Sequence, residues 1–88
     1  MSRYQVKIKN SAQRDLKKLK RSHLKSAFLN IVEELKVNPY SPKHSFKLLQ
    51  PPHLRRYSRR LNLQHRVVYT VDDSNKIVYI LSAWSHYE

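Results

Sequence analysis

Residues 57–71, which read YSRRLNLQHRVVYTV, place four basic side chains between apolar positions. These are Arg59, Arg60, His65 and Arg66. The core of a sheet has no need of such residues, whereas a phosphate-binding surface does, because a guanidinium group holds phosphate oxygens with a fixed fork of donors. The stretch therefore predicts a strand pair with a cationic site for phosphate chemistry on its solvent-facing side. We expect the residues at 86–88 to complete that site.

The overall charge indicates a polyanionic partner. Eighteen Lys and Arg residues face six Asp and Glu, which gives a formal net charge of +12. Such a field attracts polyanions. Residues 41–66 contain seven of the cations and no acid (Lys43, Lys47, Arg55, Arg56, Arg59, Arg60 and Arg66). This clustering favours nucleic acid or an acidic protein. A membrane surface is disfavoured, because no helical segment pairs a basic face with a Trp/Phe-rich one.

The composition limits which kinds of domain, metal site and cofactor site the protein can have. Eighty-eight residues are enough for one small domain, here residues 1–88. The absence of Cys excludes disulfides and thiolate metal sites, and the absence of Gly excludes Gly-rich phosphate-binding loops. The five His lack a convincing zinc spacing, so we predict no metal and no cofactor. No apolar run is long enough to span a bilayer, and we expect a cytoplasmic protein.

The elements that must position the basic residues follow from periodicity. Alternation at Tyr4, Val6 and Ile8 predicts a first strand. Asn10-Ser11 should cap a helix over residues 12–19, and apolar spacings of three and four predict a second helix over residues 24–35. Strands are expected at residues 46–49, 57–63, 67–71 and 76–84, the last of them in the interior of a sheet. This order predicts an α+β domain, in which an antiparallel sheet carries a two-helix hairpin on one face and leaves the other face open.

Three motifs together resemble the YoeB/Txe branch of the RelE toxin superfamily. They are SRR, then HRVVY, then a terminal His-Tyr, and the opening YQVKIKNSAQRDLKKL is similar to the family's first strand and helix. The resemblance covers the whole chain. It implies a RelE-like fold and a toxin of a type II toxin–antitoxin pair. It also implies partners: an acidic cognate antitoxin, the 70S-type ribosome and mRNA. A homodimer and a hetero-oligomer with the antitoxin both stay open.

The resemblance implies metal-independent cleavage of mRNA in the ribosomal A site. The ribose 2′-OH attacks the adjacent phosphorus, which requires a base, positive charge on the phosphorane and an acid for the departing 5′-oxygen. Arg66 matches the family's catalytic arginine, with pairing to Asp72 or Asp73 as the alternative. His86 matches the family's general acid, with a frayed tail as the alternative. Tyr87 matches a tyrosine that orients the substrate or stacks on a base.

Three further arginines are candidate substrate-binding residues: Arg56, Arg59 and Arg60. Arg60 should hold phosphate. Arg59 alternates with Arg60, so its side chain is expected to point the other way, toward the helices or an edge.

The general base departs from the family pattern. The YoeB branch has a Glu in the segment that reads SFKLLQPPH here, and ungapped counting from YSRR puts Lys47 at that position. Lys47, as base or as electrostatic stabiliser, is the preferred candidate, with His44, His53 and His65 as alternatives. The same departure keeps a second reading open, namely a toxin-fold protein that binds RNA, the ribosome or another target without efficient cleavage. The gyrase-directed ParE branch shares the fold and lacks the His-Tyr tail. A small basic RNA-binding module is the third reading.

Overall fold

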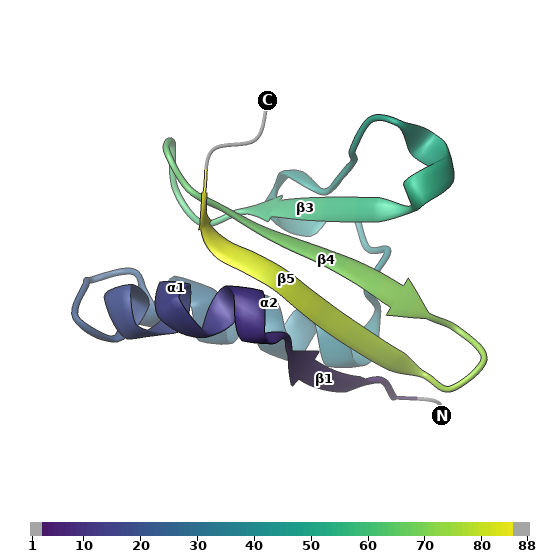
Figure 1. The fold of residues 1–88 in the computed structure, drawn as a ribbon, viewed down its shortest axis with the longest axis horizontal. Helices are drawn as coiled ribbons and strands as arrows, with labels where there is room; N and C mark the ends of the chain where they lie inside the picture. Colours follow the sequence, from purple (N-terminus) through teal and green to yellow (C-terminus); the bar gives the residue numbers. More distant parts are fainter. Residues whose placement is uncertain (1–2, 86–88) are drawn as a thin grey trace.

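The protein is a five-stranded sheet with two helices against one face (Figure 1). The computed structural model describes residues 3–85. The elements are β1 (Gln5–Ile8), α1 (Asn10–Lys20), α2 (Lys25–Val37), β2 (Lys47–Leu48), β3 (Arg56–Arg60), β4 (Arg66–Asp72) and β5 (Ile77–Ser85). Two 3-10 turns, η1 (Lys43–Ser45) and η2 (Pro52–Leu54), flank β2. The predicted α+β class is confirmed, with its N-terminal strand and its helical hairpin on one face.

The sheet is mixed, so the prediction of an antiparallel sheet was wrong in one pairing. The strand order is β1-β5-β4-β3-β2, and β1 runs parallel to β5 while the other pairs are antiparallel. A parallel pair needs a long crossover, and the segment between β1 and β5 contains both helices and the other three strands. β5 lies between β1 and β4, which confirms the interior position predicted for it.

The core lies between the helices and the sheet. The apolar stripe predicted for the second helix is confirmed, because Phe28, Ile31 and Leu35 are all buried on α2. They meet side chains of the helix-facing side of the sheet, among them Tyr69 and Ile80. Among the described residues no helix is long and apolar enough to cross a membrane.

The start of α1 differs from the expected cap. The helix begins at Asn10, its N-cap is Lys9, and no side chain caps it. The Ser11 hydroxyl instead donates a 2.6 Å hydrogen bond to the Leu81 carbonyl of β5. Asn10 and Ser11 both lie inside the helix, after the N-cap position, and the predicted Asn10-Ser11 cap is therefore absent.

Candidate functional site

The register of β3 and β4 sorts their side chains onto two faces. Tyr57 lies opposite Tyr69 on the helix-facing side of the sheet, where both contact the core. Because strand side chains alternate, the pair Arg60 and Arg66 points to the other side. We call this second side of β2, β3 and β4 the open face. The predicted placement of basic strand residues away from the helices is confirmed for this pair.

Arg60 and Arg66 are direct cross-strand neighbours, which brings two like charges together. Opposed positions in an antiparallel pair have Cβ atoms about 4.5–5.5 Å apart, and like charges there are destabilising. Within residues 3–85 the ion pairs are Lys36 with Glu33 and Lys43 with Glu34, so no described carboxylate compensates the two arginines. An arrangement of this kind becomes favourable when an anion lies between the guanidinium groups.

Ser58 orients Arg66. The Arg66 Nη1 donates to the Ser58 Oγ at 3.3 Å, and Ser58 is completely buried. Sequence reasoning missed this residue, although the alternation from Arg60 places Ser58 on the same face. The alternative in which Arg66 pairs with an aspartate is wrong for the described residues. Asp72 accepts from Asn75, and Asp73 accepts from Tyr4 and Tyr40.

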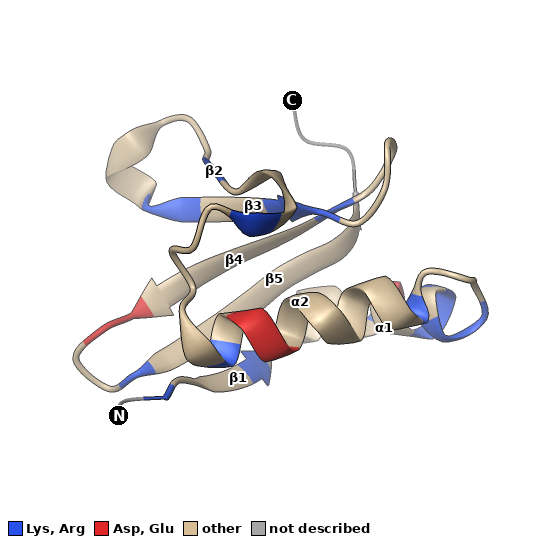
Figure 2. Cartoon of the chain, turned by 180° about the vertical axis from the view of Figure 1, so that it is seen from behind, with Lys and Arg blue, Asp and Glu red and all other residues tan. Residues whose placement is uncertain are grey.

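Two other predicted cations share the open face. Lys47 is exposed on β2 and lies opposite Ser58, and Arg56 is half-buried opposite Thr70. The Nε atom of Arg56 is buried without a hydrogen-bond partner in the described part of the chain. In Figure 2 Lys and Arg colour both ends of β3 and the start of β4, whereas Asp and Glu lie on α1, α2 and the β4–β5 turn, next to further Lys and Arg. The described residues form no pocket, so a ligand here would meet an open surface.

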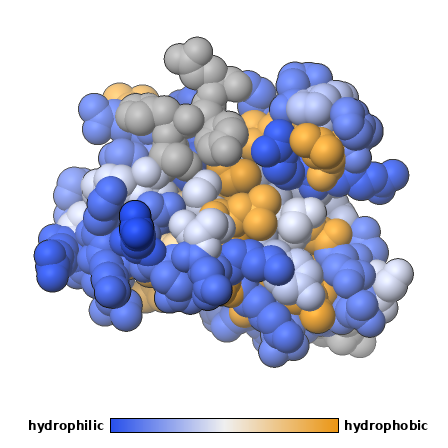
Figure 3. All heavy atoms as spheres, viewed as in Figure 1, coloured by the Kyte–Doolittle hydropathy of each residue, from blue (hydrophilic) through white to orange (hydrophobic). Residues whose placement is uncertain are grey.

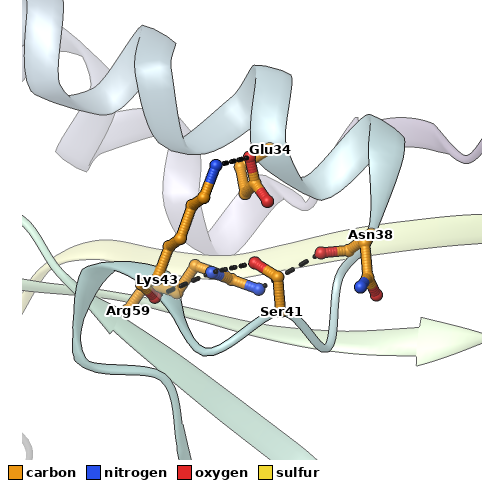
Figure 4. Close-up of polar contacts among 5 residues, drawn as sticks. All are labelled: Glu34, Asn38, Ser41, Lys43 and Arg59. Carbon is orange, nitrogen blue, oxygen red and sulfur yellow. Dashed lines mark hydrogen bonds and ion pairs between the residues drawn. The ribbon is translucent and has the colours of Figure 1, made fainter.

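Arg59 does not belong to this surface. It is 0% exposed, and its guanidinium donates to the Tyr69 hydroxyl and to the Lys43 and Asn38 carbonyls. It also donates to the Ser41 hydroxyl (Figure 4). A group sealed in the interior cannot contact a polyanionic substrate. The assignment of Arg59 as a substrate-binding residue is therefore corrected, whereas its expected direction, toward the helices, is right.

The Arg59 network extends to a carboxylate on α2. A hydrogen bond from Ser41 and the charges of Lys43 and Arg59 hold the pKa of Glu34 below its usual range, against the opposing effect of burial. The Lys43 Nζ lies 3.6 Å from Glu34 Oε2 (Figure 4). This network ties residues 38–45 to β3 and α2, and it thus fixes the loop that leads into β2 and Lys47.

The predicted tail residues His86 and Tyr87 lie outside the described residues. The last described position is Ser85, whose Cα partner across the sheet is Arg66. The neighbouring His65 stacks on Trp84, with ring centroids 4.0 Å apart. His65 is thus used in packing.

The other alternative bases, His44 and His53, lie in two different 3-10 turns. His44 is half-buried in η1, with its Nδ1 buried and without a partner among the described residues, and His53 is exposed in η2. Between Glu34 and Asp72 the chain has no acid at all, so no carboxylate replaces the missing Glu in that segment. Among residues 3–85 no three His, Asp or Glu side chains group as metal ligands.

One family model matches nearly the whole chain. The model of the family "ParE toxin of type II toxin-antitoxin system, parDE" matches residues 6–88. No curated protein sequence matches significantly. A solved structure of a YoeB/ParE toxin from Agrobacterium tumefaciens is similar in fold, with a TM-score of 0.84, 20% identity and coverage of 94% of this chain and 99% of that one.

Two solved complexes are also similar. The heterotetrameric YoeB–YefM toxin–antitoxin complex from Staphylococcus aureus has a TM-score of 0.79 and 26% identity, and the match covers 98% of this chain and 100% of that one. The archaeal RelE–RelB complex from Pyrococcus horikoshii has a TM-score of 0.76 and 26% identity, with 93% of each chain covered.

Proposed function

Because this chain belongs to the ParE toxin family of type II toxin–antitoxin systems, we propose that it is a toxin that cuts mRNA in the ribosomal A site. The observation that carries the proposal is the uncompensated pair Arg60 and Arg66 on the open face. Their register sets two forked donors side by side, where a phosphodiester would neutralise their mutual repulsion. The resemblance to the YoeB branch in SRR, HRVVY and the terminal His-Tyr supports the same reading.

In the proposed reaction the 2′-oxygen forms a bond to phosphorus and the bond from phosphorus to the 5′-oxygen breaks. The products are a 2′,3′-cyclic phosphate and a 5′-OH. Arg66 stabilises the negative charge that develops on the phosphorane, and Arg60 holds the phosphate. His86 gives its proton to the departing oxygen. Consecutive Cα atoms lie about 3.8 Å apart, and the residue before His86 is the Cα partner of Arg66, which supports this assignment.

For the general base we propose Lys47, which matches the position of the family's Glu, and its place in the sheet supports the choice. Lys47 lies opposite Ser58, the residue that accepts from Arg66. It therefore shares one surface with the two arginines and adds positive charge there. A deprotonated lysine can accept the 2′-OH proton, and neighbouring cations favour that form. A lysine that stays protonated would still stabilise the phosphorane.

The proposed partners follow from the charge of the open face. An acidic antitoxin segment that orders on binding would cover Arg60 and Arg66. The similar chains from Staphylococcus aureus and Pyrococcus horikoshii were each solved with an antitoxin. The proposed target, ribosome-bound mRNA, places the protein in the cytoplasm.

A second candidate function is binding without cleavage. Two observations favour it: the matching family model is that of ParE, and the family's Glu is missing from residues 45–53. Such a toxin would use the same cationic face to hold its target and would not cut RNA.

Expression in growing cells separates the two functions. The wild type, Arg66→Ala and His86→Ala are compared, with Lys7→Ala on β1, at the far edge of the sheet, as the charge-matched control. We expect growth arrest and mRNA cut at codon positions with wild type and Lys7→Ala, and neither with the other two. Arrest without cleavage would replace the nuclease with the binding function. Cleavage that persists in both Arg66→Ala and His86→Ala would overturn the assigned site.

A further inference from the structure

The pairing of β5 with β4 slips twice near the proposed site. Tyr69 pairs with Ile80, but Val68 pairs with Ser82 and Arg66 with Ser85. Between the first and the last of these pairs, β5 therefore advances by five residues while β4 advances by three. An unbroken register would instead have set Ala83 opposite Arg66.

The slips fall in the part of β5 that lies beyond its pairing with β1, which ends at Ile80. Two side chains of α1 bind backbone groups of β5 in this stretch. The Ser11 hydroxyl donates to the Leu81 carbonyl at 2.6 Å, and Asp15 Oδ2 accepts from the Ala83 amide at 3.0 Å. Ser11 and Asp15 are four residues apart, so they lie one above the other on the same side of the helix.

Asp15 stands out by its surroundings. It is the only acid of α1, a helix that also carries Arg14, Lys17, Lys18 and Lys20. Hydrophilic side chains gather over this helix in Figure 3. Among the described residues Asp15 nevertheless forms no ion pair with these cations, and its carboxylate is half-buried and directed at the β5 backbone. A carboxylate that accepts from an amide makes a stronger hydrogen bond than a neutral acceptor does.

We propose that Asp15 is a positioning residue for the proposed RNA-cleaving site. By holding the Ala83 amide it stabilises the bulged register that sets Ser85 opposite Arg66. Loss of both bulges would move Ser85 by two residues, or about 6.6 Å, along the sheet relative to Arg66. The expected effect of Asp15 on cleavage rests on the proposed function. Its expected effect on the register of β5 does not, because the register is a property of the fold.

The first measurement addresses the register. Asp15→Ala removes the acceptor, Asp15→Asn keeps an amide oxygen in its place, and Gln13→Ala alters an exposed neighbour on the same helix. Hydrogen exchange of the Ala83 amide and NMR contacts between the backbones of Ser85 and Arg66 are compared in the folded proteins. We expect faster exchange and loss of the Ser85–Arg66 contacts in Asp15→Ala alone. An intact register in Asp15→Ala would overturn the proposal.

The second measurement addresses cleavage of ribosome-bound mRNA. We expect Asp15→Ala to lower kcat by roughly 10- to 100-fold with KM within twofold of wild type, because small displacements of catalytic groups are costly while the binding charges stay in place. Asp15→Asn should restore kcat to within about threefold. A shifted register with unchanged kcat would overturn the positioning role. A wild type that cleaves no mRNA would refute the proposed function. The claim that Asp15 holds the register of β5 would then be judged by the exchange and NMR measurements alone.

Discussion

The guanidinium of Arg59 lies against the phenol of Tyr69, with 3.1 Å between Nε and Oη, and both side chains are sealed in the interior. Each group has further partners, since Tyr69 donates to the Pro39 carbonyl at 2.6 Å and Arg59 donates to two carbonyls. The buried charge is thus surrounded by acceptors from the loop after α2. The pair thus links β3, β4 and that loop by hydrogen bonds. It lies on the helix-facing side of the sheet, beneath the open face.

Arg59→Met should destabilise the protein strongly. The substitution fills much of the same volume but leaves several buried acceptors without donors, and each unsatisfied group costs about 1–3 kcal/mol. We expect the free energy of unfolding in urea to fall by on the order of 3 kcal/mol. Arg60→Met on the open face is the matched control, and it should leave stability unchanged or slightly higher because it relieves a like-charge pair. Equal effects of the two substitutions would contradict the role assigned to the buried guanidinium.

Ionisation of the Tyr69 phenol should lower the free energy of unfolding at alkaline pH. Burial raises the pKa of the Tyr69 phenol to about 12, although the nearby Arg59 opposes the shift. Between pH 10 and 12 the folded protein keeps a proton that the unfolded chain has lost, so stability declines as pH rises through this window. The decline attributable to this group is on the order of 2–3 kcal/mol.

The measurement compares urea unfolding of wild type and Tyr69→Phe as a function of pH. The substituted protein lacks the titrating phenol, so its stability should fall less steeply over the same window. Parallel curves for the two proteins would show that the phenol titrates alike in the folded and unfolded states.

Ser58→Ala should impair cleavage more than stability. Its hydroxyl accepts from Arg66 Nη1, and without it the guanidinium samples more orientations. A hydrogen bond to a charged group contributes about 1.5 kcal/mol, so we expect roughly tenfold slower cleavage of ribosome-bound mRNA with a modest change in unfolding free energy. A Ser58→Ala protein that cleaves at the wild-type rate would show that Arg66 needs no such support.

RNA binding should depend on salt through the open face. Each phosphate contact made to single-stranded RNA contributes about 0.7 to the slope of log K against log salt concentration. Arg66→Ala and Arg60→Ala should each lower the slope by about that amount, because each removes one phosphate contact. Lys7→Ala, at the opposite edge of the sheet, should leave it unchanged. A uniform effect of all three would indicate general charge attraction instead of a defined face.

Periodicity in the sequence predicts much of this fold. The helical spacing of Phe28, Ile31 and Leu35 locates the core, and strand alternation places Arg60 and Arg66 away from it. These signals are local, and each reports which side of an element is buried.

Other features depend on partners far apart in the chain. The parallel pairing of β1 with β5 and the slips opposite Arg66 cannot be read from any single segment. Ser11 looks like a helix cap, and only the nearby Leu81 carbonyl explains its different use. Burial of Arg59 depends on acceptors supplied by a distant loop, whereas its residue type predicts exposure.

The place of β5 between β1 and β4 has a consequence for synthesis. Of the five strands it is the last to leave the ribosome, yet it joins the first strand to the remaining three. A nascent chain that still lacks this strand cannot close the sheet or present Arg66 beside Ser85. A protein proposed to act on translating ribosomes thus cannot form its proposed site before β5 has been synthesised.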